Sequence, residues 1–125
     1  MKKTLLLFTI FFTFTLVQSQ SFSYKFGAAF FNTGGVFISL NGNINLDDSV
    51  LTISTIDKNN VESKATYSLV KQTNNIFYFT DGVKTYSFVT MSKSGKKKGF
   101  EYDSLVVWAW ILQESNSVMY YCKKQ

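Results

Sequence analysis

The chain has 125 residues, of which 46% are hydrophobic, 18% aromatic and only 17% charged. This length is typical of a single domain, and a chain so apolar and so low in charge is not disordered. It contains no His and a single Cys, which excludes Ser-His-Asp and Cys-His catalytic systems, His-ligated metals and an internal disulfide framework. We therefore expect no cofactor, no metal ion and no enzymatic activity.

The N-terminus has the layout of a secretory signal peptide. Lys2 and Lys3 precede a run from Thr4 to Val17 in which every residue is apolar or Thr, and Ser19 completes a small-residue cleavage pattern. The run is shorter than the ~20 residues that a membrane-spanning helix needs. We expect a helical signal peptide over residues 1–19, cut near Ser19; an uncleaved anchor or a cut one or two residues away are the alternatives.

Cleavage would leave residues 20–125 as one domain. Loss of Lys2 and Lys3 lowers the net charge from +5 to +3, and all 13 basic residues of the chain are Lys. Nucleic acid is a poor partner for this chain, because bidentate recognition of phosphate and guanine favours Arg. Abundant Lys, Asn and Phe without Pro indicate an AT-rich genome, and the short Lys-Lys signal favours a bacterial protein sent to the periplasm or the medium.

The residues after Ser19 alternate with a period of two, as β-strands do. The clearest unit runs from Ile76 to Val89, where Asp81-Gly82 predicts a two-residue type I′ hairpin turn. Burying an aromatic ring stabilises a fold by ~2 kcal/mol, so we expect the aromatic face of this hairpin to point inward. That face carries Phe77, Phe79, Tyr86 and Phe88.

The remaining turns and strands follow from similar signals. Asn41-Gly42 predicts a second hairpin turn, the polar stretch at 47–49 predicts a bend or bulge before the next strand, and the polar stretch at 57–60 predicts a further turn. The Lys- and Ser-rich segment Met91–Gly99 predicts a loop. Phe100–Leu112 is the longest expected strand; its alternation puts Tyr102 on the face of Val106 and Trp108, and its second half is apolar on both faces.

About eight short strands joined by short turns predict an all-β fold. Because neighbouring strands are consecutive in the chain, we expect a single antiparallel meander. It would form a small up-and-down barrel, a curled sheet or a sandwich.

Four aromatic residues form the candidate binding site. Trp108 and Trp110 share one strand face ~6.8 Å apart, and Phe77 and Tyr86 belong to the aromatic face of the hairpin. Together they offer a surface for a small apolar ligand or a protein partner. The alternative is that these rings simply pack the core.

Two further groups of charged residues admit a functional and a structural interpretation. Lys93, Lys96, Lys97 and Lys98 predict weak attraction to anionic surfaces, or else a solvated hairpin tip. Glu101 and Asp103 are carboxylates spaced as in a glycosidase pair, although exposure beside the lysines favours a structural role.

Oxygen-bearing side chains and the thiol close the set of candidates. Asp47 and Asp48, with Asn43 and Asn45, have oxygen atoms suited to a weak calcium site, but a hairpin turn explains the pattern better. Cys122 is either a buried small hydrophobe or the origin of an intermolecular disulfide.

The sequence therefore predicts a small secreted, non-catalytic binding or interaction module, with an apolar ligand or a protein as its partner. We expect it to be a monomer. The alternative is a structural, envelope-associated protein with no small-molecule site.

Overall fold

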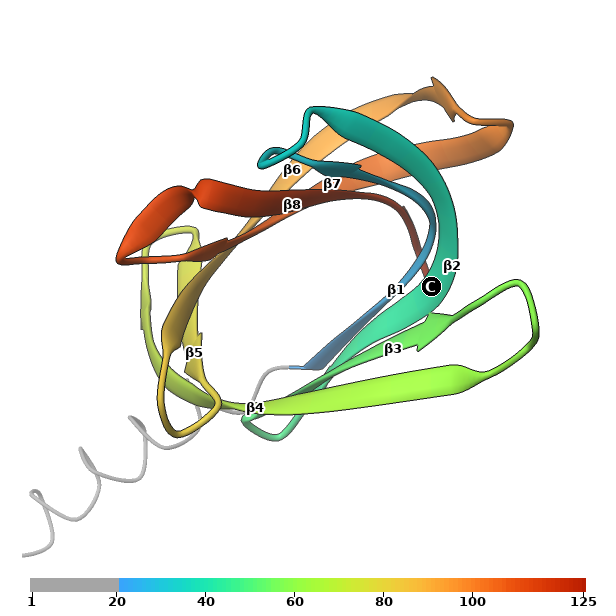
Figure 1. Ribbon diagram of the computed structural model, residues 1–125. Coiled ribbons are helices and arrows are strands. Elements are labelled where there is room, and N and C mark those ends of the chain that lie inside the picture. The colour runs from blue at the N-terminus through green and yellow to red at the C-terminus, as the bar shows by residue number, and fades with distance from the viewer. Residues whose placement is uncertain (1–20) are drawn as a thin grey trace, which may run out of the picture.

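In the computed structural model, residues 21–125 are described, and they form eight antiparallel strands (Figure 1). The strands follow chain order around a closed barrel, and β8 pairs with β1 to complete the ring. The expected all-β meander is confirmed, and among the three expected forms it is the barrel. The predicted signal peptide, residues 1–19, lies outside the described residues. The strands are β1 (Ser21–Phe31), β2 (Val36–Asp47), β3 (Val50–Ile56), β4 (Glu62–Thr73), β5 (Ile76–Thr80), β6 (Thr85–Lys97), β7 (Phe100–Trp110) and β8 (Gln113–Lys124).

The inside of the barrel is a packed core. Alternate residues of each strand point inward, because successive side chains of a strand lie on opposite faces. The expected inward face of the β5–β6 hairpin is confirmed, since all four of its rings belong to this interior cluster. The largest fully buried side chains are Phe26, Ile44, Leu51, Phe79, Phe88, Val106 and Cys122.

The turn between β5 and β6 differs from the expected two-residue turn. Thr80 pairs with Thr85, so the connection is a four-residue loop, Asp81–Lys84. The Asp81 carboxylate accepts hydrogen bonds from the backbone N–H groups of Val83 at 2.9 Å and Lys84 at 2.8 Å. These bonds give the donors of the longer loop a partner within the loop itself. The register differs from the expected one by two residues, and for that reason the same side chains still face inward.

The hairpin turn predicted at Asn41-Gly42 is wrong, because β2 runs through these residues. Gly42 lies beneath the ring of Phe26; a Cβ atom there would clash with that ring and with the Ser54 carbonyl oxygen. The glycine therefore allows a close approach inside the sheet. The β2–β3 turn lies at Asp48 and Ser49, whose φ angles of 49° and 75° are both positive.

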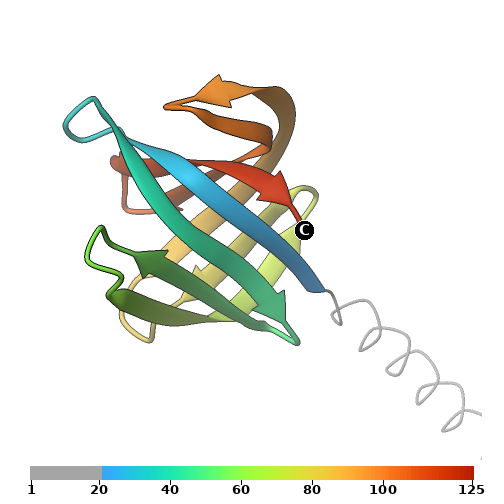
Figure 2. The ribbon, with the colours of Figure 1, turned by 90° about the vertical axis from the view of Figure 1, so that its right-hand side faces the viewer.

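The loop predicted at Met91–Gly99 is also wrong. β6 continues to Lys97, and a tight turn at Lys98-Gly99, with φ angles of 53° and 80°, leads into β7. Figure 2 shows this hairpin, in orange, curling at the top of the barrel. We call its outer part, residues 92–102, the arm.

The arm folds back over the outer wall of the barrel. The Phe100 ring lies where a side chain of Gly27 would stand, and the Tyr102 and Tyr121 ring centroids are 4.9 Å apart. Tyr102 thus packs with a small outer cluster and not on the inner face with Trp108, as its spacing in the sequence suggested. The buried members of this outer cluster are Ala28, Leu105 and Tyr121.

Candidate functional site

Three of the four predicted site residues lie inside the barrel. Trp108 is only 7% exposed, and its ring centroid lies 4.8 Å from that of Tyr67 and 4.8 Å from that of Tyr86. Phe77 and Tyr86 pack against the same interior cluster. These rings fill the barrel, so Trp108 offers almost no surface to a ligand.

Trp110, the fourth predicted residue, has a different environment. It is half-buried, and the Lys84 ammonium lies 4.5 Å from its ring centroid. Its indole N–H is buried and has no hydrogen-bond partner among the described residues. The structure therefore does not combine Trp108 and Trp110 into one open aromatic surface.

The candidate carboxylate pair is exposed on β7, and Asp103 has a structural partner. The Asp103 carboxylate accepts the backbone N–H of Lys124 at 3.0 Å and the hydroxyl of Ser104 at 3.0 Å. These bonds, chiefly the one from Lys124, lower the pKa of Asp103. A carboxyl group held in its ionised form is a poor general acid, so these bonds give Asp103 a structural role at the end of β8 and do not suit it to donate a proton.

The oxygen-bearing residues of β2 do not gather at the turn. Asn43 and Asn45 belong to the strand itself, and Asp48 begins the turn. Among the side chains that the structure describes, there is no group of three or more His, Cys, Asp or Glu that could hold a metal ion.

Lysines of the arm have two kinds of surroundings. The Lys97 ammonium lies 4.4 Å from the Phe37 ring centroid and 5.7 Å from that of Tyr121. These cation–π contacts hold the arm against the outer wall of the barrel. Lys93, Lys96 and Lys98 are exposed.

Cys122 lies in the core with no exposed surface. Burial raises the pKa of its thiol to about 12, which keeps the thiol protonated and unreactive at neutral pH.

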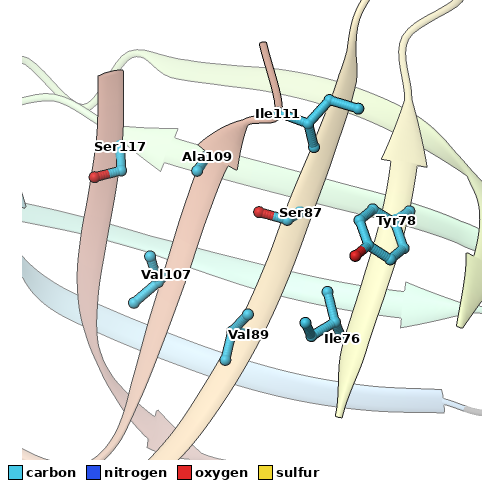
Figure 3. A pocket seen from close by; sticks show the side chains of 8 residues that line it. All are labelled: Ile76, Tyr78, Ser87, Val89, Val107, Ala109, Ile111 and Ser117. Carbon is cyan, nitrogen blue, oxygen red and sulfur yellow. The ribbon is translucent and has the colours of Figure 1, made fainter. Parts of the chain in front are cut away.

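An apolar groove of about 550 Å³ crosses the outer wall over β5, β6, β7 and β8 (Figure 3). Its floor is a single row of residues in register across these strands: Tyr78, Ser87, Ala109 and Ser117. A parallel row of larger side chains forms one ridge: Ile76, Val89 and Val107. Ile111 stands on the opposite side.

Differences in side-chain size create this groove. Serine and alanine form a low floor between β-branched neighbours, and Ala109 is only 6% exposed although it is on the outside of the barrel. The sequence does not predict the groove, because its strongest pattern is the aromatic face that points into the barrel. The signal that could have predicted the groove is the second apolar face of β7. A strand in the wall of a barrel buries only its inner face, so its outer face is normally polar.

One positive charge stands at the edge of the groove. The described lining residues are all uncharged. Lys71 of β4 pairs with Tyr78 in register, and its ammonium lies 5.0 Å from the Tyr78 ring centroid. The row that forms the floor therefore ends on a lysine.

Comparison of the chain with protein families, with curated proteins and with solved structures finds no match. Residues 21–125 include no helix long and apolar enough to cross a membrane.

Proposed function

We propose that this chain is a small secreted bacterial binding module without catalytic activity, and that it binds an apolar ligand in the groove on the outer wall of β5–β8. The groove carries this proposal. Its volume of about 550 Å³ lies within the range of small-molecule sites, which are mostly apolar with a few polar groups. Secretion is supported by the signal-peptide pattern of residues 1–19.

The outer position of the site follows from how the barrel is filled. Phe22, Phe77 and Phe88 pack on one another with ring centroids 5.3 to 6.2 Å apart, and Trp108 is covered by further rings. A ligand inside would have to displace this core. The groove, in contrast, is open to solvent and needs no rearrangement.

Filling the floor of the groove tests this function. Ser87→Leu places a larger side chain on the floor, so we expect it to weaken binding of the neutral apolar dye N-phenyl-1-naphthylamine by about tenfold or more, since a methylene misfit alone changes affinity by ~1–3 kcal/mol. Thr66→Leu is the matched control, because Thr66 is exposed on β4 and does not line the groove.

Dye fluorescence is titrated with both variants and the parent protein, after circular dichroism shows that all three are folded. The proposal predicts similar dye affinity for the parent protein and Thr66→Leu, and a lower dye affinity for Ser87→Leu. Folded parent protein that leaves the dye fluorescence unchanged, or equal affinity in Ser87→Leu, would refute a binding site in this groove.

A further inference from the structure

We infer that the ligand of the groove is a single-chain anionic amphiphile, of the class of medium-chain fatty acids, whose hydrocarbon chain lies along the floor and whose carboxylate faces Lys71. This inference rests on the proposed function and specifies the ligand class of the same site. It follows from the length and width of the groove and from the charge at its end.

The floor has the length of a medium hydrocarbon chain. Its four residues lie on four neighbouring strands, and strands of a sheet are ~4.8 Å apart, so the floor is about 14 Å long. Carbon–carbon bonds of ~1.5 Å advance an extended chain by about 1.3 Å per carbon. A chain of about ten carbons therefore spans the floor from Tyr78 to Ser117.

The width of the groove favours a single hydrocarbon chain over two chains side by side. Val107 and Ile111 stand two positions before and two positions after Ala109 in the sequence of β7 and its turn. Residues two apart in a strand are separated by ~6.8 Å, so the two ridges stand about 13.6 Å apart, and the side chains of both ridges occupy part of that distance. What remains above Ala109 is a channel about one hydrocarbon chain wide.

The charge at the end of the floor favours an anion. Lys71 continues the row of Tyr78 onto β4, and its ammonium lies over the Tyr78 ring. Among the side chains that the structure describes, the one salt bridge joins Lys64 to Glu62, so no described carboxylate lies within salt-bridge distance of Lys71. At the other end of the row, the backbone N–H of Asn32 donates to the Ser117 carbonyl, and neither side chain is charged.

The neighbouring rows add no opposing charge. Thr73 pairs with Ile76 on one side of Lys71, and Thr80 and Thr85 form the row on the other side. The backbone N–H of Leu69 donates to the Ser49 carbonyl, so the turn that carries Asp47 and Asp48 borders β4 near Lys71. Neither carboxylate forms a salt bridge with Lys71. A bound amphiphile with a negative head would thus meet a cation that has no carboxylate partner among the described side chains.

Displacement of N-phenyl-1-naphthylamine by three ten-carbon ligands tests this inference. Decanoate, decanol and decyltrimethylammonium share the chain and differ in the charge of the head. They are titrated below their micelle concentrations against the protein purified after expression of the full chain, and against Lys71→Gln and Lys64→Gln. The second variant removes the same charge from the same strand at a position outside the groove.

We expect Lys71→Gln to weaken decanoate binding by up to about fivefold, the upper end of the range for one ion pair at a protein surface, and to leave decanol binding unchanged. Decyltrimethylammonium should bind the parent protein more weakly than decanoate. Lys64→Gln should behave as the parent protein does.

Three results would overturn the inference while leaving the groove as a binding site. These are failure of decanoate to displace the bound dye, an equal effect of Lys71→Gln on decanoate and decanol, or an equal effect of both lysine variants on decanoate. If the folded parent protein binds neither the dye nor decanol, the proposed function itself fails and this inference fails with it.

Discussion

At Gly42 the absence of a side chain allows the ring of Phe26 to lie against the sheet. A methyl group at this position would meet that ring and a backbone oxygen of β3 at contact distances that real Cβ atoms do not show. We therefore expect Gly42→Ala to lower the free energy of unfolding by about 3 kcal/mol, the upper part of the usual range for overpacking. Urea denaturation measures the change.

Gly34→Ala is the control for this substitution. Its nearest neighbour is the Val36 side chain at 3.4 Å, which is ordinary contact, so the midpoint should change little. Equal stability of the two variants would mean that Phe26 does not cover Gly42.

Cys122 makes stability depend on pH in the alkaline range. Burial raises the pKa of its thiol from 9.0 to about 12, so the fold favours the neutral thiol. A raised pKa of this kind contributes stability that is complete below about pH 9 and is lost as the pH rises towards 12. Tyr120 acts in the same direction, because burial raises its pKa from 10.0 to about 12.

Comparison with Cys122→Ala isolates the thiol, since Tyr120 is present in both proteins. The difference in unfolding free energy between parent and variant should be constant up to about pH 8.5. Above pH 9 the parent should lose its advantage by up to ~1.4 kcal/mol per pH unit. A difference that stays constant to pH 11 would contradict the burial of this thiol.

At the scale of the strand, alternation predicted the architecture well and the turns less well. The period of two identified the inner face of β5 and β6 despite the wrong register, because a shift of two residues preserves the faces. Asn41-Gly42 is a strong hairpin signal when only the neighbouring residues in the sequence are considered. The contact that requires a glycine there comes from Phe26 on a neighbouring strand, which a local pattern does not reveal.

The sequence does not predict the arm, and the reason is similar. Lysines and serines predict a loop by composition, yet both sides of this hairpin are exposed over much of their length and pair mainly with each other. The decisive contacts are those of Phe100 with Gly27 and of Lys97 with Phe37. These residues are about 60 or more positions apart in the sequence, and only the closed barrel brings them together.

The candidate site shows the same division between what alternation predicts and what it does not. Alternation predicts which residues share a face, and it placed Phe77 and Tyr86 on one face correctly. Alternation alone does not predict which of the two faces points into the barrel; that prediction comes from the burial of the aromatic rings. Once the aromatic residues fill the interior, the opposite face of β7, with Val107 and Ala109, is left as the outer groove.

At the scale of the whole molecule, closure of the barrel brings the two ends of the described chain together. β1 and β8 are hydrogen-bonded neighbours, and the backbone N–H of Gln125 donates to the Ser23 carbonyl at 3.0 Å. An open meander would leave these strands at opposite edges of a sheet. Closure instead pairs residues 24–31 of β1 with residues 118–124 of β8, so neither strand is left as the edge of an open sheet.

A circular permutant tests this closure. Joining Gln125 to Ser21 through about four Gly or Ser residues, and opening the chain between Gly34 and Gly35, keeps every strand intact. Both glycines are exposed in the β1–β2 loop, where new ends are tolerated. We expect the permutant to retain the circular dichroism spectrum and cooperative unfolding of the parent, with a loss of about 1–2 kcal/mol in the free energy of unfolding.

As the control, the same linker is combined with an opening between Val106 and Val107, which cuts a core strand and should abolish folding. A Gly34–Gly35 permutant that does not fold would show that the short linker cannot join the ends, and hence that β1 and β8 are not neighbours.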